Sequence, residues 1–129
     1  MSPADFLNYK NWVVIGDVLN STKYAYRILN ALKEHGLNVS GIHPKDESGL
    51  VYRSLKEVPY SIEVIDLCIN PKYGMEFIKE AKGMGINNIL IQPGAESPEI
   101  IKFAEENKMS AVEGCALVSL SKIKNNAKL

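Results

Sequence analysis

The sequence has no excess of charge of either sign and no long hydrophobic run. Its 129 residues include 15 basic and 15 acidic side chains, so no overall field attracts nucleic acid or an anionic membrane. No apolar stretch approaches the roughly 20 residues that a membrane-spanning helix needs. We therefore expect no nucleic-acid partner and no membrane association.

Cysteine is also scarce. The two cysteines, Cys68 and Cys115, lack the close spacing of a zinc-binding pair, which excludes that kind of metal site. The first residues lack the basic start and apolar run of an export signal. Because disulfides persist in oxidising compartments, we expect two free thiols and a cytoplasmic protein.

Several catalytic motifs are missing as well. The chain contains no GxSxG nucleophile elbow, no HExxH pair and no P-loop, so we assign no catalytic residue and no metal ligand. A binding role for the chain by itself is therefore favoured over an enzymatic one.

Short apolar segments alternate with amphipathic ones along the chain. Because such alternation is typical of β-α-β units, it predicts one doubly wound α/β domain over residues 1–129, with helices on both faces of a parallel sheet. Strands are expected at residues 12–15, 37–42, 63–69, 88–91 and 110–113, and helices at about 22–35, 71–82 and 98–106.

Side chains that favour helix N-termini support these boundaries. Ser21 and Thr22 are expected to cap the first helix, and Asn70 and Ser97 precede prolines that suit a first helical position. After Cys115 the chain is expected to fray through its last residues, KIKNNAKL.

The segment WVVIGDVLNSTK, residues 12–23, reads as a strand, a tight turn and a helix N-terminus. Free amides and the helix dipole make such a junction an anion site. In open α/β sheets, ligands bind beyond the carboxyl ends of the strands. The residues that follow the five predicted strands are Gly16-Asp17, His43-Pro44-Lys45, Asn70-Pro71, Gln92-Pro93-Gly94 and Gly114-Cys115.

The first of these loops has one glycine, whereas the dinucleotide fingerprint GxGxxG has three. Lys45 follows the second strand, where a cation suits a phosphorylated ribose better than a free diol. Lys23 and Arg27 add positive charge beside the first turn. These features favour a phosphorylated nucleotide other than NAD.

A set of motifs gives the chain a family resemblance. They are VVIG at 13–16, Tyr26-Arg27, His43-Pro44, VYRSLKEVP at 51–59, VIDLCINP at 64–71, IQPGA at 91–95 and EGC at 113–115. In their order and spacing, the chain resembles the CoA-binding family of small Rossmann-like proteins, similar to the CoA-binding domain of the succinyl-CoA synthetase α subunit. The resemblance covers a core of about residues 11–118.

The resemblance implies the strand order 3-2-1-4-5 and coenzyme A, or an acyl-CoA, as the cofactor. It places the pyrophosphate over the first turn, the 3′-phosphoadenosine near the tip of the second strand, and the remainder along the next two loops. The predicted cofactor-binding residues are Gly16, Asp17, Asn20, Ser21, Thr22, Lys23, Tyr26, Arg27, His43, Pro44, Lys45, Asn70, Pro71, Gln92, Gly94 and Cys115.

Four residues, in three places, depart from the family pattern. Asp17 replaces a small or apolar residue, Tyr24-Ala25 replaces Pro-Ser, and Arg53 replaces a proline. A carboxylate about 4 Å from a phosphate would cost roughly 4 kcal/mol at an effective dielectric constant near 20, so Asp17 opposes CoA binding unless cations offset it.

We therefore expect a non-catalytic module that binds a small-molecule nucleotide of the CoA class. Two alternatives remain: a subunit of an enzyme acting on CoA thioesters, and an NAD-type nucleotide-binding protein. A homo-oligomer or a partner enzyme subunit remains open. A phosphoacceptor receiver domain ranks lower, because Asp17 stands alone after the first strand and Asn70-Pro71 follows the third.

Overall fold

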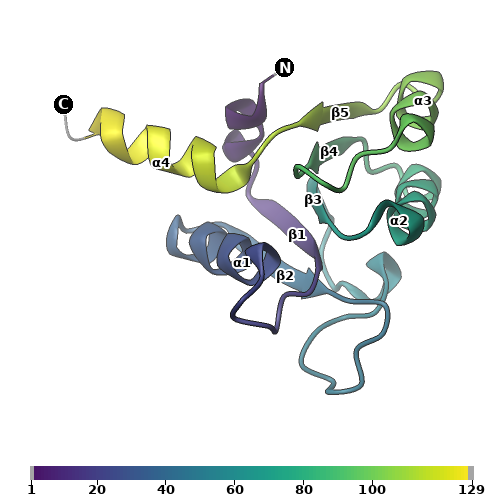
Figure 1. Ribbon diagram of the computed structural model, residues 1–129, viewed down its shortest axis with the longest axis horizontal. Helices are drawn as coiled ribbons and strands as arrows, with labels where there is room; N and C mark the ends of the chain where they lie inside the picture. Colours follow the sequence, from purple (N-terminus) through teal and green to yellow (C-terminus); the bar gives the residue numbers. More distant parts are fainter. Residues whose placement is uncertain (1, 128–129) are drawn as a thin grey trace.

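A single sheet of five parallel strands forms the centre of the computed structural model, which describes residues 2–127, with side chains to residue 124 (Figure 1). The strands are β1 (Asn11–Gly16), β2 (Asn38–Ile42), β3 (Val64–Cys68), β4 (Asn88–Ile91) and β5 (Ser110–Glu113). The α-helices are α1 (Tyr24–Glu34), α2 (Pro71–Gly83), α3 (Pro98–Glu106) and α4 (Ala116–Ala127), and two short 3₁₀ helices are η1 (Pro3–Asn8) and η2 (Leu55–Glu57).

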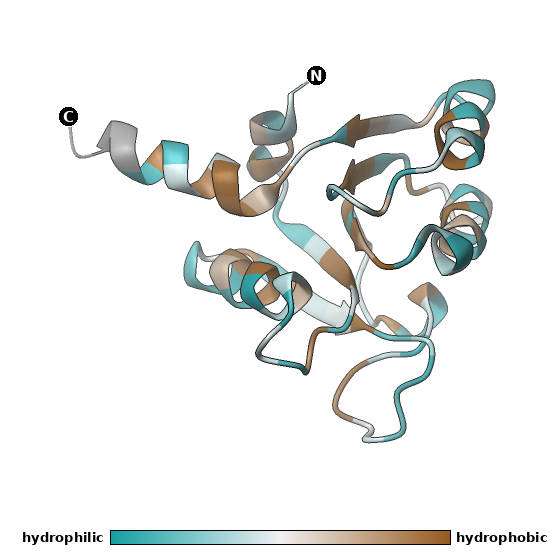
Figure 2. Ribbon diagram, in the orientation of Figure 1, coloured by the Kyte–Doolittle hydropathy of each residue, from teal (hydrophilic) through white to brown (hydrophobic). Residues whose placement is uncertain are grey.

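Each face of the sheet carries its own hydrophobic core. On one face, α2 and α3 pack on β-strand side chains that include Ile15, Ile65 and Leu67. On the other face, α1, α4 and η1 pack on residues that include Trp12 and Val14. Successive apolar strand residues alternate between the two cores, so the middle strands are mostly hydrophobic, with Asp66 in β3 as a buried acidic exception. Figure 2 shows the apolar residues in brown. The predicted doubly wound α/β class is confirmed.

The predicted strand order, 3-2-1-4-5, is wrong. The observed order is β2-β1-β3-β4-β5, with β3 hydrogen-bonded between β1 and β4. The residues from Val64 to Leu67 are all 0 % exposed, and only a strand with neighbours on both sides offers such burial. The outer edge of β2 meets a single parallel bridge, between Ile42 and Tyr52.

Two further boundaries differ from the sequence prediction. Helix α1 begins at Tyr24, after an N-cap residue, Lys23, that makes no side-chain cap. Thr22 does not cap this helix because its N–H and hydroxyl both donate to Asn20 Oδ1, at 3.0 and 2.7 Å. The fraying expected over residues 122–129 is not observed as far as Ala127, and the last segment is helical to that residue. It forms α4 because Ala116 and Leu120 are buried in the same core as α1, and the final residues 128–129 lie outside the described part of the chain.

The predicted caps of α2 and α3 are confirmed. Asn70 Oδ1 accepts a hydrogen bond from Lys72 N at 2.9 Å, and Ser97 Oγ accepts one from Ile100 N at 3.1 Å. Both helices begin with proline. None of the helices within residues 2–127 combines the length and hydrophobicity that crossing a membrane requires.

Candidate functional site

All five strands point the same way, so the loops that follow them meet at one edge of the sheet. The register aligns Ile15 with Ile42 and Gly16 with Cys68. The turn after β1 therefore lies between the loop after β2 and the end of β3. We call this the carboxyl edge.

The turn after β1 is tightly enclosed. A Cβ atom on Gly16 would overlap the carbonyl oxygen of Cys68 and lie 3.0 Å from the Cβ of Ala25. Val18, which is 1 % exposed, anchors the turn, and its N–H donates to Gly16 O at 2.9 Å. Asp17 lies between the buried residues Gly16 and Val18 and is exposed. The chain thus needs glycine at position 16 for close packing, whatever ligand the turn meets.

The start of α1 presents amide donors and positive charge. The first turn of this helix has backbone N–H groups without helical acceptors, as at every helix N-terminus. Lys23, Tyr24 and Arg27 are exposed there, while Tyr26 is half-buried. The Arg27 guanidinium lies over the Tyr24 ring, 5.2 Å from its centroid. Asn20, Ser21 and Thr22 form the turn ahead of the helix. Such a junction suits an anionic group.

The residues after β2 form the second part of the edge. His43 Nδ1 accepts a hydrogen bond from Lys45 N at 3.1 Å, so the neutral ring carries its proton on Nε2. Lys45 Nζ donates to Tyr73 Oη at 2.8 Å and lies 4.8 Å from the centroid of the Tyr73 ring. This hydrogen bond to Lys45 lowers the pKa of Tyr73. The Lys45 side chain is thus in contact with α2.

A cavity of about 340 Å³, which we call the tip cavity, lies between the ends of β1 and β2. It is lined by Asp17, Val18, Leu19, His43, Lys45, Asp46, Glu47 and Ser48. Asp46 accepts hydrogen bonds from Ser48 Oγ at 2.6 Å and from the N–H groups of Ser48 and Gly49. These bonds, the Ser48 hydroxyl foremost, lower the pKa of Asp46 and hold its carboxylate within its own loop. The tip cavity unites three predicted site residues, Asp17, His43 and Lys45.

The ends of β3, β4 and β5 carry the remaining predicted residues, farther along the edge. Asn70 caps α2 ahead of Pro71. Gly94 donates its N–H to Glu96 Oε2 at 2.7 Å. Gln92 is 3 % exposed and donates its side-chain amide to Asp66, which directs it into the protein. Cys115 is half-buried immediately before α4, and its carbonyl accepts a hydrogen bond from Ser119 N.

Asp66 was not predicted from the sequence. It is 0 % exposed in the middle of β3, and Oδ2 accepts the Gln92 amide at 2.8 Å. Its other oxygen, Oδ1, has no hydrogen-bond partner within the described residues. Burial raises the pKa of Asp66 to about 8. The sequence did offer a sign of this buried carboxyl, because Asp66 is the one charged residue within the apolar run VIDLC.

Burial, followed by the nearby Asp66 and Cys115, raises the pKa of the Cys68 thiol to about 12. Both cysteines are free. Cys68 therefore carries almost no thiolate at neutral pH.

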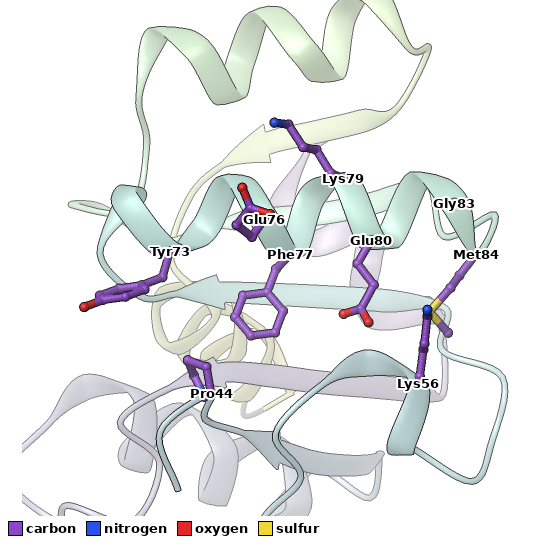
Figure 3. A pocket seen from close by; sticks show the side chains of 9 residues that line it. All are labelled: Pro44, Lys56, Tyr73, Glu76, Phe77, Lys79, Glu80, Gly83 and Met84. Atoms are coloured by element: carbon purple, nitrogen blue, oxygen red, sulfur yellow. The ribbon is translucent and has the colours of Figure 1, made fainter.

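A larger groove of about 730 Å³ runs along α2, opposite η2 (Figure 3). Phe77 and Glu80 point from α2 toward the side that carries Pro44 and Lys56, and Tyr73 extends from the start of the helix at one end of the groove. Glu80 Oε1 accepts a hydrogen bond from Leu55 N at 3.1 Å, which joins η2 to α2. Among the described residues of the predicted site, Pro44 lines this groove and Lys45 contacts its wall at Tyr73, so the groove adjoins the predicted nucleotide site.

The family model described as a CoA binding domain matches residues 10–121. The chain belongs to this family of CoA binding domains. Its match extends from the start of β1 into α4 and includes every predicted site residue.

Solved structures share the fold. A conserved hypothetical protein from Pyrococcus furiosus is 34% identical, with a TM-score of 0.77 over 85% of this chain and 98% of that chain. A hypothetical protein from Pyrococcus horikoshii OT3 is 28% identical, with a TM-score of 0.83 over 92% and 87%. A protein from Thermus thermophilus, at 18% identity and a TM-score of 0.77 over 92% of both chains, shows the fold alone. A search of curated proteins found no match.

Proposed function

We propose that this chain binds coenzyme A or an acyl-CoA at the carboxyl edge, as a non-catalytic, cytoplasmic binding or regulatory module. The observation that carries the proposal is the family match over residues 10–121, which spans all five strands and their loops. The pyrophosphate would lie at the start of α1, where free amides and the side chains of Lys23 and Arg27 favour negative charge.

Several polar side chains of the carboxyl edge are hydrogen-bonded within the protein, so in this proposal the contacts with the pyrophosphate fall to the backbone amides and cations at the start of α1. Asn70 caps a helix, Gln92 bonds Asp66, and Asp46 accepts three bonds within its own loop. These side chains shape the edge and are already committed to the protein itself. The two free cysteines agree with a reducing compartment.

Thermal denaturation with added ligand tests the proposal. At 100 times its dissociation constant, CoA is expected to raise the free energy of unfolding by about 2.7 kcal/mol, a shift of several degrees in Tm. A shift with NAD and none with CoA would instead favour the NAD-type alternative. Mass spectrometry of any ligand that stays bound through gentle purification identifies that ligand independently.

Charge reversals at the two ends of α1 test where on this helix the pyrophosphate binds. Lys23→Glu, at the start of the helix, is expected to weaken CoA binding roughly tenfold, because it places a carboxylate where the pyrophosphate would lie. Lys33→Glu makes the same change near the other end of α1 and is expected to leave the affinity near that of the wild type. Equal effects of both variants would argue against binding at the start of α1.

A further inference from the structure

The tip cavity carries more negative than positive charge. Three carboxylates line it, those of Asp17, Asp46 and Glu47, against one ammonium group and the His43 ring. In doubly wound α/β folds, the ribose of a bound nucleotide lies near the end of the second strand. The charges of this cavity therefore decide which form of the ribose the chain accepts.

The ammonium group of Lys45 is already engaged. It donates to the Tyr73 hydroxyl at 2.8 Å and lies 4.8 Å from the centre of the Tyr73 ring. A phosphate in the tip cavity would therefore compete with Tyr73 for the position of this ammonium group. His43 offers Nε2 as its remaining donor, because Nδ1 accepts the N–H of Lys45.

Two of the three carboxylates are available to a ligand. Asp17 and Glu47 are exposed, and neither makes a hydrogen bond or an ion pair within the described residues. Asp46 is occupied by its loop but contributes its charge, because the bonds from Ser48 and Gly49 lower its pKa. Ionised carboxylates accept hydrogen bonds from ribose hydroxyls and repel a phosphate on the same ring.

We propose that the tip cavity receives a ribose with free 2′- and 3′-hydroxyls, so that the chain prefers dephospho-CoA, or an ester of it, over CoA. Asp17 and Glu47 accept the hydroxyl hydrogens, and Tyr73 competes with a 3′-phosphate for the ammonium group of Lys45. This inference rests on the proposed binding of a nucleotide of the CoA class. It reverses the expectation, based on the cation after the second strand, that this position reads a phosphorylated ribose.

Titration calorimetry with CoA and with dephospho-CoA tests the preference. At about 50 mM salt, dephospho-CoA is expected to bind roughly tenfold more tightly, and the ratio is expected to shrink at about 500 mM salt because salt screens the repulsion. CoA binding equally well or better would overturn the inference and leave the proposed function intact. If neither ligand binds, the proposed function fails and the inference fails with it.

Paired variants assign the effect to these side chains. The double variant Asp17→Asn with Glu47→Gln is expected to gain roughly tenfold in CoA affinity relative to dephospho-CoA, because two charges are lost from the cavity. Glu99→Gln with Glu105→Gln, on α3, removes the same number of charges elsewhere and is expected to leave the ratio unchanged. An unchanged ratio in the first variant, or an equal change in the second, would overturn the assignment.

Tyr73→Phe tests the role of Lys45. Removing the hydroxyl that bonds Lys45 Nζ is expected to strengthen CoA binding and to leave dephospho-CoA binding unchanged. A parallel change for both ligands would show that Tyr73 does not govern the phosphate preference.

Discussion

The Gln92 side-chain amide donates a hydrogen bond of 2.8 Å to Asp66 Oδ2, and this pair is enclosed between the sheet and the helices that cover one face. Asp66 Oδ1 has no partner within the described residues, so an ionised carboxylate there would be poorly compensated. Burial raises the pKa of Asp66 to about 8, and the folded chain therefore holds this proton more tightly than the unfolded chain does.

Stability is accordingly expected to depend on pH through Asp66. Its contribution to the free energy of unfolding is greatest below the ordinary pKa of about 3.9, falls as pH rises toward about 8, and changes little above that. Within this window the loss is on the order of 1 kcal/mol per pH unit. Asp66→Asn removes the titration, so its stability relative to the wild type is expected to increase with pH.

Urea denaturation at about pH 5, 7 and 9 measures this effect. Glu105→Gln, an exposed carboxyl on α3, serves as the control and is expected to follow the wild type. Parallel curves for Asp66→Asn and the wild type would contradict the raised pKa.

Gly16→Ala is expected to destabilise the fold. The new methyl group would overlap Cys68 O, a backbone atom that moves only with β3, and overpacking of this kind costs about 1–3 kcal/mol. Gly83→Ala is the matched control, since a methyl group there meets nothing within 4 Å. It is expected to raise stability by up to about 1 kcal/mol through helix propensity. Thermal unfolding of both variants measures the difference, and similar Tm values would contradict the close approach.

Tyr60→Phe probes the contact that attaches the end of the long loop to the sheet. Tyr60 Oη donates to Trp12 O at 2.6 Å and lies 3.0 Å from Ser40 Oγ. Removing the hydroxyl is expected to lower the free energy of unfolding by about 1–2 kcal/mol, because the remaining polar groups lose a half-buried partner. Tyr24→Phe, at an exposed ring, is the control. If denaturant midpoints of the two variants coincide, the hydroxyl contributes nothing.

Cys68 is expected to resist alkylation in the folded chain. With its pKa raised to about 12, its thiolate fraction at pH near 8 is negligible, and iodoacetamide reacts with the thiolate. Peptide mass spectrometry before and after unfolding in urea tests this expectation. Modification of Cys68 at the same rate in both states would contradict it.

Helix starts that depend on neighbouring residues could be predicted from the sequence. The Ser97-Pro98 pair predicted the start of α3, and Asn70-Pro71 predicted the start of α2, because a cap and a proline act on their immediate neighbours. The start of α1 was misplaced because the N–H and hydroxyl of Thr22 bond Asn20, so Thr22 does not cap the helix.

Contacts and strand pairings between residues far apart in the sequence could not be predicted in this way. The strand order depends on which strands are neighbours in three dimensions, and the order that the family resemblance implied left β3 in the wrong place. Likewise, Lys45 was identified as a cation beside the nucleotide site, yet its hydrogen bond to Tyr73, 28 positions away, appears only in three dimensions. The proposed ribose preference arises from that contact and from the convergence of Asp17 with Glu47.

The bridge between Ile42 and Tyr52 also isolates the loop that lies between them. His43 N donates to Tyr52 O at 2.9 Å, and Tyr52 N donates to Gly41 O at 3.2 Å, so both ends of the loop are fastened to the same strand. Substitutions or insertions between these two points can reshape the wall of the tip cavity while the register of the sheet stays the same. The wall of the tip cavity and the register of the sheet thus depend on different parts of the chain.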